Sequence, residues 1–228
     1  MYLGWSVKTI DIASYLDSTN LRPEASESDI RHLCMEAARY KMAAVCVNPA
    51  RLSLAEKLLS GSEVNLCTVI GFPLGADGLS RKIYSAAKAL DDSADELDMV
   101  INIGAVKDQD LITVGREIDG LLALKKERDF IAKIIVETAL LTVNELIMLI
   151  RLINDSGADF IKTSTGFSTR GVNLEDIHII NAHKSKELKV KASGGIKSLG
   201  FALELLGLGV NRLGTSSAGM LIDEYKEN

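Results

Sequence analysis

The sequence is poor in the features that mark secreted, zinc-binding and membrane-spanning proteins. It has only three cysteines, Cys34, Cys46 and Cys67, an odd number without a Cys-X-X-Cys spacing. Such a set argues against a disulfide framework and a zinc site, and it favours a reducing compartment. No run approaches the roughly 18 apolar residues of a membrane helix, and the first residues lack a basic region followed by an apolar one. We therefore expect a cytoplasmic protein without membrane contacts.

Blocks of basic residues and linker-like tracts are also missing. The chain has 26 Lys and Arg against 31 Asp and Glu, a formal net charge of −5. Nucleic acid is therefore a poor candidate partner, and an anionic small molecule would need a local positive site. No low-complexity stretch divides the 228 residues, so we expect one domain over residues 1–228.

Short apolar runs alternate with longer amphipathic segments along the whole chain. The runs predict strands at Tyr15–Thr19, Ala43–Asn48, Asn65–Gly71, Glu96–Asn102, Ile131–Thr138, Phe160–Thr165, Lys189–Ser193 and Arg212–Ser216. The amphipathic segments predict helices at Glu27–Tyr40, Leu79–Asp92, Leu111–Arg128, Val143–Ser156 and Leu174–Ser185, among others. Eight strands with intervening helices indicate the α/β class and favour a (β/α)8 barrel, although a doubly wound open sheet gives a similar pattern.

Ionisable residues recur with the same phase on consecutive predicted strands. Asp98, Lys133, Lys162 and Lys191 lie in the fourth to seventh of them. Strands of a barrel are covered by helices outside and packed side chains inside, so they normally read apolar on both faces. One such lysine more often pairs with a carboxylate at a strand end. The shared phase favours convergence in the barrel interior.

Three lysines near one aspartate, with Glu137 further along the fifth strand, leave a surplus of positive charge. Burial and like-charge repulsion both lower the pKa of a lysine. A neutral amine attacks carbonyl groups and forms Schiff bases. Lys162, within the segment FIKTSTGF at 160–167, is the lysine we expect to act in this way.

Glycine and serine follow three neighbouring predicted strands. Gly166 follows the sixth strand, Ser193-Gly194-Gly195 lie at the end of the seventh, and Gly214-Thr215-Ser216-Ser217 lie at the end of the eighth. Barrels often hold phosphate with the loops after their last strands, where glycine lets backbone N–H groups approach the anion. Each pair of glycines alone is more often a turn. Their succession after adjacent strands favours a phosphate site.

Several segments of the chain resemble a known family. The segments ELDMVINIGAVK, KIIVETALLT, FIKTSTGF, VKASGGI and RLGTSSA, in this order, look like the deoxyribose-phosphate aldolases, and AAVCVNP and TVIGFPLG are similar to earlier strands of that family. The resemblance implies a (β/α)8 barrel that cleaves 2-deoxy-D-ribose 5-phosphate reversibly to D-glyceraldehyde 3-phosphate and acetaldehyde through a lysine Schiff base. It also implies a reaction without metal or organic cofactor, phosphosugar and aldehyde as the small-molecule partners, and a homo-oligomer, either a dimer or a tetramer.

The resemblance also implies roles for individual residues. Lys162 would form the Schiff base, Asp98 would transfer protons, and Lys191 would lower the pKa of Lys162 and join a proton relay. The substrate-binding residues would be Asp17, Thr19, Cys46, Lys133 and Thr165, with Lys133 supporting Asp98. The phosphate would be held by Gly166, Gly194, Gly195, Gly214, Ser216 and Ser217.

The chain departs from the family pattern in two places. The first-strand motif, usually Asp-His-Thr-Leu-Leu-Lys-Pro, reads DSTNLRP, which introduces Ser18, Asn20 and Arg22. After FIKTSTGF, the usual Ser-Thr-Gly-Gly-Ala becomes STRGV. We expect Arg170 in this segment to add an ion pair beside the phosphate loop or to narrow access.

Two other functions remain open from the residues alone. One is another Schiff-base phosphosugar aldolase, such as a transaldolase, and the other is a barrel that binds a phosphosugar without catalysis. A metal-dependent aldolase is disfavoured because no His, Asp and Glu cluster with ligand spacing is visible. The three histidines, His32, His178 and His183, lie on helix-like segments and are expected to be solvated or satisfied. Trp5 is expected to anchor the N-terminal segment across the barrel bottom or on a partner subunit.

Overall fold

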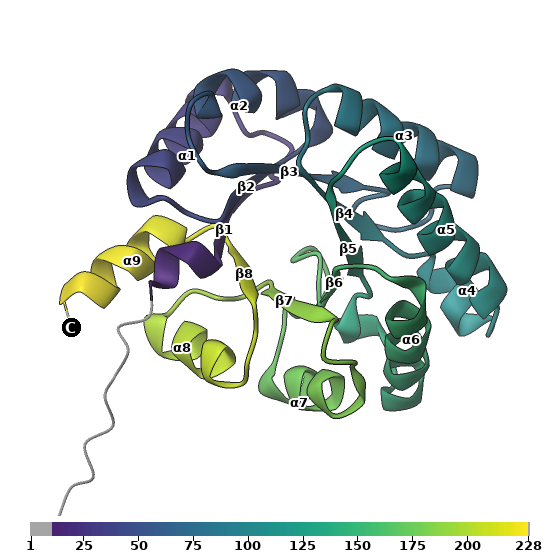
Figure 1. Ribbon diagram of the computed structural model, residues 1–228. Helices are drawn as coiled ribbons and strands as arrows, with labels where there is room; N and C mark the ends of the chain where they lie inside the picture. The colour runs from purple at the N-terminus through teal and green to yellow at the C-terminus, as the bar shows by residue number, and fades with distance from the viewer. Residues whose placement is uncertain (1–10, 228) are drawn as a thin grey trace, which may run out of the picture.

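The computed structural model describes residues 11–227 and shows a closed barrel of eight parallel strands in sequence order. Figure 1 looks into the ring of strands, with the helices outside it. The strands are β1 (Leu16–Asn20), β2 (Ala44–Val47), β3 (Asn65–Ile70), β4 (Glu96–Val100), β5 (Ile131–Ile135), β6 (Phe160–Lys162), β7 (Lys189–Ser193) and β8 (Arg212–Thr215). β8 pairs with β1 and closes the ring. The (β/α)8 prediction is confirmed, and the open-sheet alternative is wrong. Trp5 lies outside the described residues.

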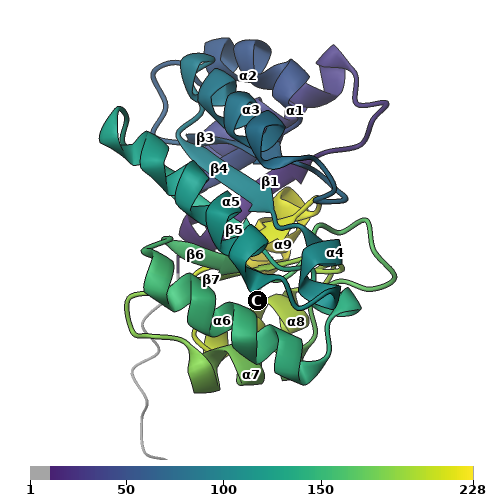
Figure 2. The ribbon, with the colours of Figure 1, turned by 90° about the vertical axis from the view of Figure 1, so that its right-hand side faces the viewer.

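Helices connect the strands and cover the barrel from outside, as the side view in Figure 2 also shows. The helices are α1 (Glu27–Tyr40), α2 (Leu52–Leu59), α3 (Leu79–Asp91), α4 (Ile103–Lys107), α5 (Leu111–Ala123), α6 (Val143–Ser156), α7 (Leu174–His183), α8 (Leu199–Gly207) and α9 (Ala218–Glu227). Short 3-10 turns lie at Ile12–Tyr15, Pro49–Arg51, Leu124–Lys126 and Thr138–Leu140. The five helices predicted by periodicity are all present, three of them shorter at the carboxyl end.

Local sequence accounts for the helix ends. Ser26 and Asp29 form a capping box at the start of α1, and Thr142 and Glu145 form another at the start of α6. In each case the side chain of one residue accepts the backbone N–H of the other, so two donors of the first turn are satisfied. Gly157 ends α6 in the left-handed conformation that glycine adopts without steric cost.

β5 and β6 are shorter than predicted, and this places the key lysine at a strand end. β6 ends at Lys162, although the predicted strand continued to Thr165, and β5 ends at Ile135 instead of Thr138. Glu137 has φ 56°, which no regular strand accommodates, so the chain leaves the sheet there. Lys162 therefore lies at the carboxyl end of the barrel, where barrel enzymes build their active sites.

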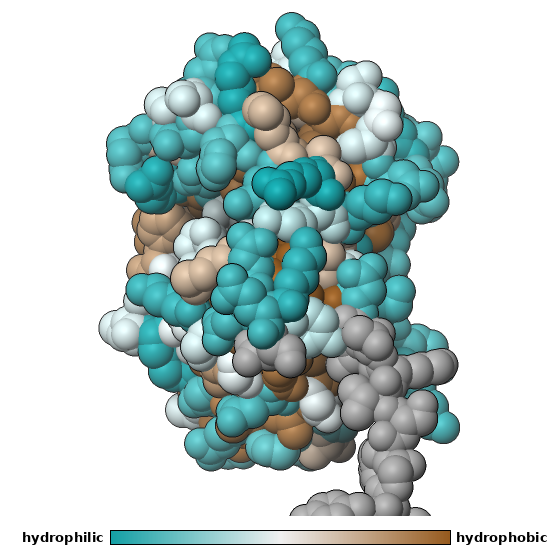
Figure 3. All heavy atoms as spheres, turned by 90° about the vertical axis from the view of Figure 1, so that its left-hand side faces the viewer, coloured by the Kyte–Doolittle hydropathy of each residue, from teal (hydrophilic) through white to brown (hydrophobic). Residues whose placement is uncertain are grey.

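The main apolar core lies between the strands and the surrounding helices. Alternate residues of β4 show the arrangement: Leu97 and Met99 join this core, while Glu96 and Asp98 are fully buried on the other face of the strand. The outer surface over α1, α8 and α9 is mostly hydrophilic, with smaller hydrophobic patches between the charged side chains (Figure 3). Within residues 11–227, none of the helices combines the length and apolar character needed to cross a bilayer.

Candidate active site

A cavity of about 790 Å³ opens at the carboxyl ends of the strands, where several of the predicted site residues meet. Its lining includes Thr19, Lys162, Thr165, Gly166, Gly194, Gly195, Gly214, Ser216 and Ser217. The other predicted residues, Asp17, Cys46, Asp98, Lys133 and Lys191, are fully buried. Some of the predicted site residues therefore line the cavity. The others are buried within the barrel strands.

Lys162 and Asp98 connect the cavity to the buried charges. Lys162 Nζ lies 2.7 Å from Asp98 Oδ2, and its side chain is only 4% exposed. The same oxygen is 2.8 Å from Lys191 Nζ, while Asp98 Oδ1 is 2.7 Å from Lys133 Nζ. One carboxylate therefore contacts the three lysines that the sequence predicted to converge.

Further buried charges surround this group. Lys191 Nζ lies 2.5 Å from Asp17 Oδ2, and Lys133 Nζ lies 2.5 Å from Glu96 Oε2. Arg212 joins the two carboxylates, at 2.6 Å from Asp17 Oδ1 and 3.1 Å from Glu96 Oε1. Sequence reasoning missed Glu96 and Arg212 as members of the site. The sequence contained signs of both residues. Glu96 shares a strand face with Asp98, and Arg212 begins the eighth strand, where it pairs in register with Lys191.

These contacts keep the carboxylates ionised. Burial alone raises the pKa of Asp17, but Lys191, Arg212 and Lys133 outweigh it and lower the pKa to about 2. Burial likewise opposes ionisation of Asp98, yet Lys133, Lys162 and Lys191 hold its pKa well below the usual range. Asp98 is therefore a charged acceptor that orders the surrounding amines.

The two fully buried lysines remain cations. Burial lowers the pKa of Lys191, but Asp17 and Asp98 outweigh it and raise the pKa above its ordinary value. Burial also opposes the charge of Lys133, and Asp98, Cys67 and Glu96 raise its pKa. The predicted charge balance needs correction here, because it left out the carboxylates of Asp17 and Glu96. These carboxylates compensate Lys191 and Lys133, whereas the only ion pair found for Lys162 among the described residues is with Asp98.

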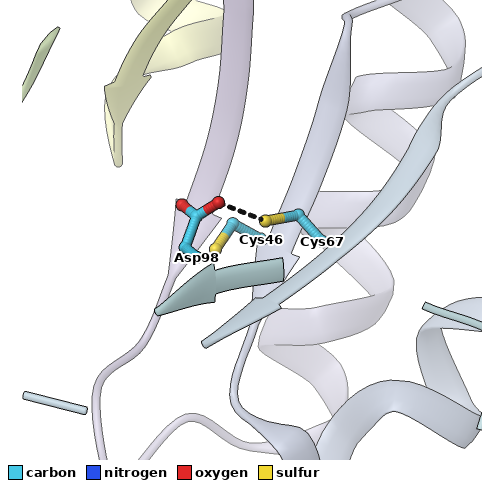
Figure 4. Close-up of side chains that lie close together, drawn as sticks. All are labelled: Cys46, Cys67 and Asp98. Carbon is cyan, nitrogen blue, oxygen red and sulfur yellow. Dashed lines mark hydrogen bonds between the residues drawn. The ribbon is translucent and has the colours of Figure 1, made fainter. Parts of the chain in front are cut away.

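Two thiols lie beside the charged group. Cys46, Cys67 and Asp98 come from β2, β3 and β4 and point toward one another (Figure 4), with their sulfur and oxygen atoms within 4.8 Å. The thiol of Cys67 lies 3.2 Å from Asp98 Oδ1. A hydrogen bond with Cys67 lowers the pKa of Cys46, whereas burial raises that of Cys67.

The donor set of these three residues would suit a thiophilic metal ion, but a protein cation already lies there. Lys133 Nζ is 2.7 Å from Asp98 Oδ1 and 3.5 Å from Cys67 Sγ. A metal bound to both atoms would lie against this ammonium group, which is electrostatically unfavourable. The arrangement therefore fits poorly with a metal, and chemistry without one stays a prediction.

The glycine-rich loops after the last strands form part of the cavity wall. Gly166, Gly194 and Gly195 all have φ between 77° and 85°, a region that disfavours side chains. Gly171 approaches Gly194 so closely that a Cβ atom on Gly171 would lie 2.0 Å from the Gly194 carbonyl oxygen. Ser216 and Ser217 directly precede α9, whose N–H groups point toward this end. Lys197 and Arg22 also line the cavity, and so do Asp29 and Glu36, so its rim carries charges of both signs.

The residues that depart from the family pattern lie in different parts of the structure. Arg170 forms a two-point ion pair with Asp176 at 2.6 and 3.0 Å, which agrees with the expected ion pair. Asn20 and Arg22 line the cavity, whereas Ser18 is buried within β1.

The three histidines are exposed, as expected for solvated side chains. His32 nevertheless lies on the outer lining of the cavity, and its Nε2 is 4.0 Å from Glu36 Oε1.

Comparison with known proteins identifies the family. The family model described as "DeoC/LacD family aldolase" matches residues 12–213. A deoxyribose-phosphate aldolase of Thermococcus gammatolerans is 47% identical over 216 residues, covering 94% of this chain and 96% of the relative. The deoxyribose-phosphate aldolase of Clostridium tetani is 42% identical over 217 residues, covering 95% of this chain and all of the relative.

Solved structures agree with the sequence relatives. A structure titled "QR15, an Aldolase" has a TM-score of 0.90 at 37% identity, covering 96% of this chain and 97% of that one. The tetrameric deoxyribose phosphate aldolase of Aeropyrum pernix has a TM-score of 0.84 at 36% identity, covering 94% and 91%. The resemblance found in the sequence motifs is therefore confirmed, and this chain belongs to the DeoC/LacD family of aldolases.

Proposed function

We propose that this chain cleaves 2-deoxy-D-ribose 5-phosphate reversibly to D-glyceraldehyde 3-phosphate and acetaldehyde, with Lys162 as the Schiff-base lysine. The observation that carries the proposal is the position of the Lys162 amine, at the end of β6 in a cavity wall and 2.7 Å from a buried carboxylate. The names of its relatives support the same reaction.

The reaction begins with the neutral amine of Lys162 adding to the aldehyde carbon C1 of the open-chain sugar. The resulting carbinolamine loses water and becomes an iminium ion, which withdraws electrons from the neighbouring bonds. The bond between C2 and C3 then breaks as the C3 hydroxyl loses its proton, and glyceraldehyde 3-phosphate leaves. The remaining enamine is protonated at C2 and hydrolysed, which releases acetaldehyde and restores the amine.

Asp98 is the proton carrier in this proposal. Its Oδ2 atom contacts Lys162, and it stays ionised under the influence of the surrounding lysines. A carboxylate in that position can accept a proton directly or through a water molecule. Lys191 stays protonated and contacts the same oxygen, while Lys133 contacts the other oxygen. Thr19, whose hydroxyl donates to the Asp17 carbonyl 2.9 Å away, and Cys46 complete the substrate-binding side.

The phosphate is proposed to lie against the loops after β6, β7 and β8. Gly166, Gly194, Gly195 and Gly214 let backbone N–H groups approach it, and Ser216 and Ser217 add donors before the N-terminus of α9. Lys197 lies on the same lining and provides charge. This arrangement distinguishes a phosphosugar from an uncharged sugar.

Reductive trapping tests the central assignment. Borohydride added with acetaldehyde should fix a two-carbon adduct on Lys162, which peptide mass spectrometry can locate. An unmodified protein, or an adduct on Lys133 or Lys191, would show that the assignment is wrong.

Donor choice tests the substrate. Acetaldehyde should serve as the donor in the synthetic direction, whereas a transaldolase-like enzyme would use a ketone such as dihydroxyacetone. If neither donor reacts and a phosphosugar still binds, the non-catalytic alternative is correct.

We also propose that the chain forms a homo-oligomer in the cytoplasm. Met35, Leu74, Tyr84 and Ile112 each expose between 68% and 74% of their surface, and a partner subunit would cover apolar side chains of this kind. The tetrameric relative supports association, and the three free cysteines support a reducing compartment. Light scattering of the purified protein distinguishes monomer, dimer and tetramer, and cell fractionation tests the compartment.

A further inference from the structure

We propose that Glu137 is a positioning residue for substrate phosphate, acting through Thr165 on the turn that carries Gly166. The proposal rests on the phosphate site proposed above and assigns a residue that holds one of its walls in place. Glu137 does not line the cavity, so its effect would be indirect.

The backbone of Glu137 has a conformation that its residue type disfavours. Its φ is 56°, and it is one of only a few non-glycine residues with positive φ in the described chain. The side chain is buried, with 2% exposure, directly after β5. Such a conformation persists where surrounding contacts over-determine it, and it is enriched at functional sites.

The carboxylate of Glu137 holds the start of the Gly166 turn. Glu137 Oε2 accepts the backbone N–H of Thr165 at 3.1 Å and also the hydroxyl of Thr165. The hydroxyl oxygen in turn accepts the backbone N–H of Phe167 at 3.1 Å. Two residues flanking Gly166 are thereby fixed by one carboxylate. The hydroxyl group of Thr165 donates its hydrogen bond to Glu137. Thr165 therefore has a structural role in addition to its place in the cavity wall.

The same turn is held at its far end by a second set of contacts. Arg170 pairs with Asp176, and Asp176 Oδ2 also accepts the hydroxyl of Thr138 at 2.8 Å. Gly171 then packs directly on Gly194 of the neighbouring loop. Because this end stays fixed, loss of the Glu137 contacts would release mainly the segment around Gly166.

The second oxygen of Glu137 permits a conservative substitution. Oε1 is buried without a hydrogen-bond partner among the described residues, whereas Oε2 makes both contacts to Thr165. In Glu137→Gln, the amide oxygen can take the place of Oε2 and accept both donors, while the amide nitrogen takes the place of Oε1 without an acceptor, which should lower stability but keep both contacts to Thr165. In Glu137→Gly, both contacts are lost, while the left-handed backbone becomes favourable and offsets part of the loss of stability.

The experiment compares the two variants on 2-deoxyribose 5-phosphate and on unphosphorylated 2-deoxyribose. We expect Glu137→Gly to raise KM for the phosphorylated sugar about tenfold, the effect of one weakened hydrogen bond to a charged group. The value of kcat/KM for 2-deoxyribose should stay within about twofold, because the effect acts through phosphate. Glu137→Gln should restore KM to near the wild-type value.

A second buried carboxylate provides the matched control. Glu117 is bonded to Lys82 Nζ at 2.7 Å and to the backbone N–H of Asn102 at 2.8 Å, and none of the three residues lines the cavity. Glu117→Gln should lower thermal stability and leave the ratio of the two KM values unchanged. If Glu137 had a purely structural role, Glu137→Gly would likewise lower thermal stability and leave the ratio of the two KM values unchanged.

The double variant Glu137→Gly/Thr165→Val tests the route of the effect. If Glu137 acts through Thr165, the double variant should be no worse than the more affected single variant, because both remove one shared interaction. Additive effects would contradict the proposed route. If Glu137→Gly fails to fold, Glu137→Asp takes its place in this comparison, because the shorter side chain moves the carboxylate away from Thr165 and Asp tolerates positive φ better than most residues.

Two outcomes overturn the proposal, and they are distinguishable. If wild type shows no preference for the phosphorylated sugar and no competitive inhibition by inorganic phosphate, the phosphate site itself is wrong, and the role of Glu137 is wrong with it. If wild type shows both, but Glu137→Gly changes the two substrates in the same proportion, only the role of Glu137 is wrong.

Discussion

Lys191 Nζ lies 2.5 Å from Asp17 Oδ2, and both side chains are almost completely excluded from solvent. The pair links β7 to β1 through the barrel interior, and Asp98 on β4 contacts the same ammonium. A buried ammonium group is tolerated only when carboxylates compensate it. The charges to which the proposed mechanism assigns a role therefore also link strands across the barrel interior.

Removal of this ammonium should destabilise the fold. We expect Lys191→Met to lower the free energy of unfolding by about 3–5 kcal/mol, because it leaves two buried carboxylates with less compensation. Urea denaturation measures the change. Lys88→Met is the control, since Lys88 pairs with Asp92 at the surface, where solvent screens the pair and its loss should change the stability much less. Equal stability of the two variants would contradict the importance of the buried pair.

The stability of the protein should fall in acid. The pKa of Asp17 is lowered from 3.8 to about 2, so the folded state favours its charged form. The stability that it contributes is complete above its unfolded pKa and is lost as the pH falls through its folded value. The difference corresponds to about 2 kcal/mol, and Asp98 acts in the same direction. Urea denaturation between about pH 5 and 2 should show this decline, and Asp17→Asn should make it shallower.

Substitution of Lys162 should separate folding from activity. Lys162→Arg keeps a positive charge near Asp98, but a guanidinium is always protonated and cannot attack an aldehyde. We expect a folded protein without detectable cleavage of 2-deoxyribose 5-phosphate. Circular dichroism checks the fold, and a coupled assay for glyceraldehyde 3-phosphate checks the reaction. Retained cleavage would remove Lys162 from the proposed mechanism.

The carboxylate of Asp98 should be needed for proton transfer. Asp98→Asn keeps the shape of the side chain, and we expect kcat to fall about 10²–10⁴-fold, the usual contribution of a general acid–base group. Cys67→Ser is the control, because a serine hydroxyl can still donate to Asp98 Oδ1 where Cys67 now lies. A fall of the same size in both variants would mean that packing around Asp98, rather than its charge, limits the rate.

Arg170 should stabilise the loop after β6. Replacing it with the usual glycine of the family removes the two contacts to Asp176 and a 2.8 Å hydrogen bond to the carbonyl oxygen of Gly171. We expect Arg170→Gly to reduce the free energy of unfolding by about 1–2 kcal/mol, less than for a fully buried pair. Arg170→Lys should be intermediate, since an ammonium group cannot form the two-point contact. An Arg170→Gly variant as stable as wild type would show that the pair adds nothing.

The sequence by itself determined the alternation of strands and helices and the inward phase of Asp98, Lys133, Lys162 and Lys191. Both depend on local periodicity, because side chains alternate along a strand and recur every three to four residues along a helix. The helix caps at Ser26 and Thr142 also depend on local sequence, since each cap involves residues three apart. The motifs around Lys162 also indicated the family before any geometry was known.

Only the tertiary structure decided which charges meet. Lys191 and Asp17 are 174 residues apart in the sequence, and closure of the barrel between β8 and β1 brings Asp17 and Arg212 into the site. The role of Glu137 was likewise invisible, because the alternation of a strand does not reveal that the chain leaves the sheet at that residue. Long-range contacts of this kind depend on the register and closure of the sheet, which no local pattern specifies.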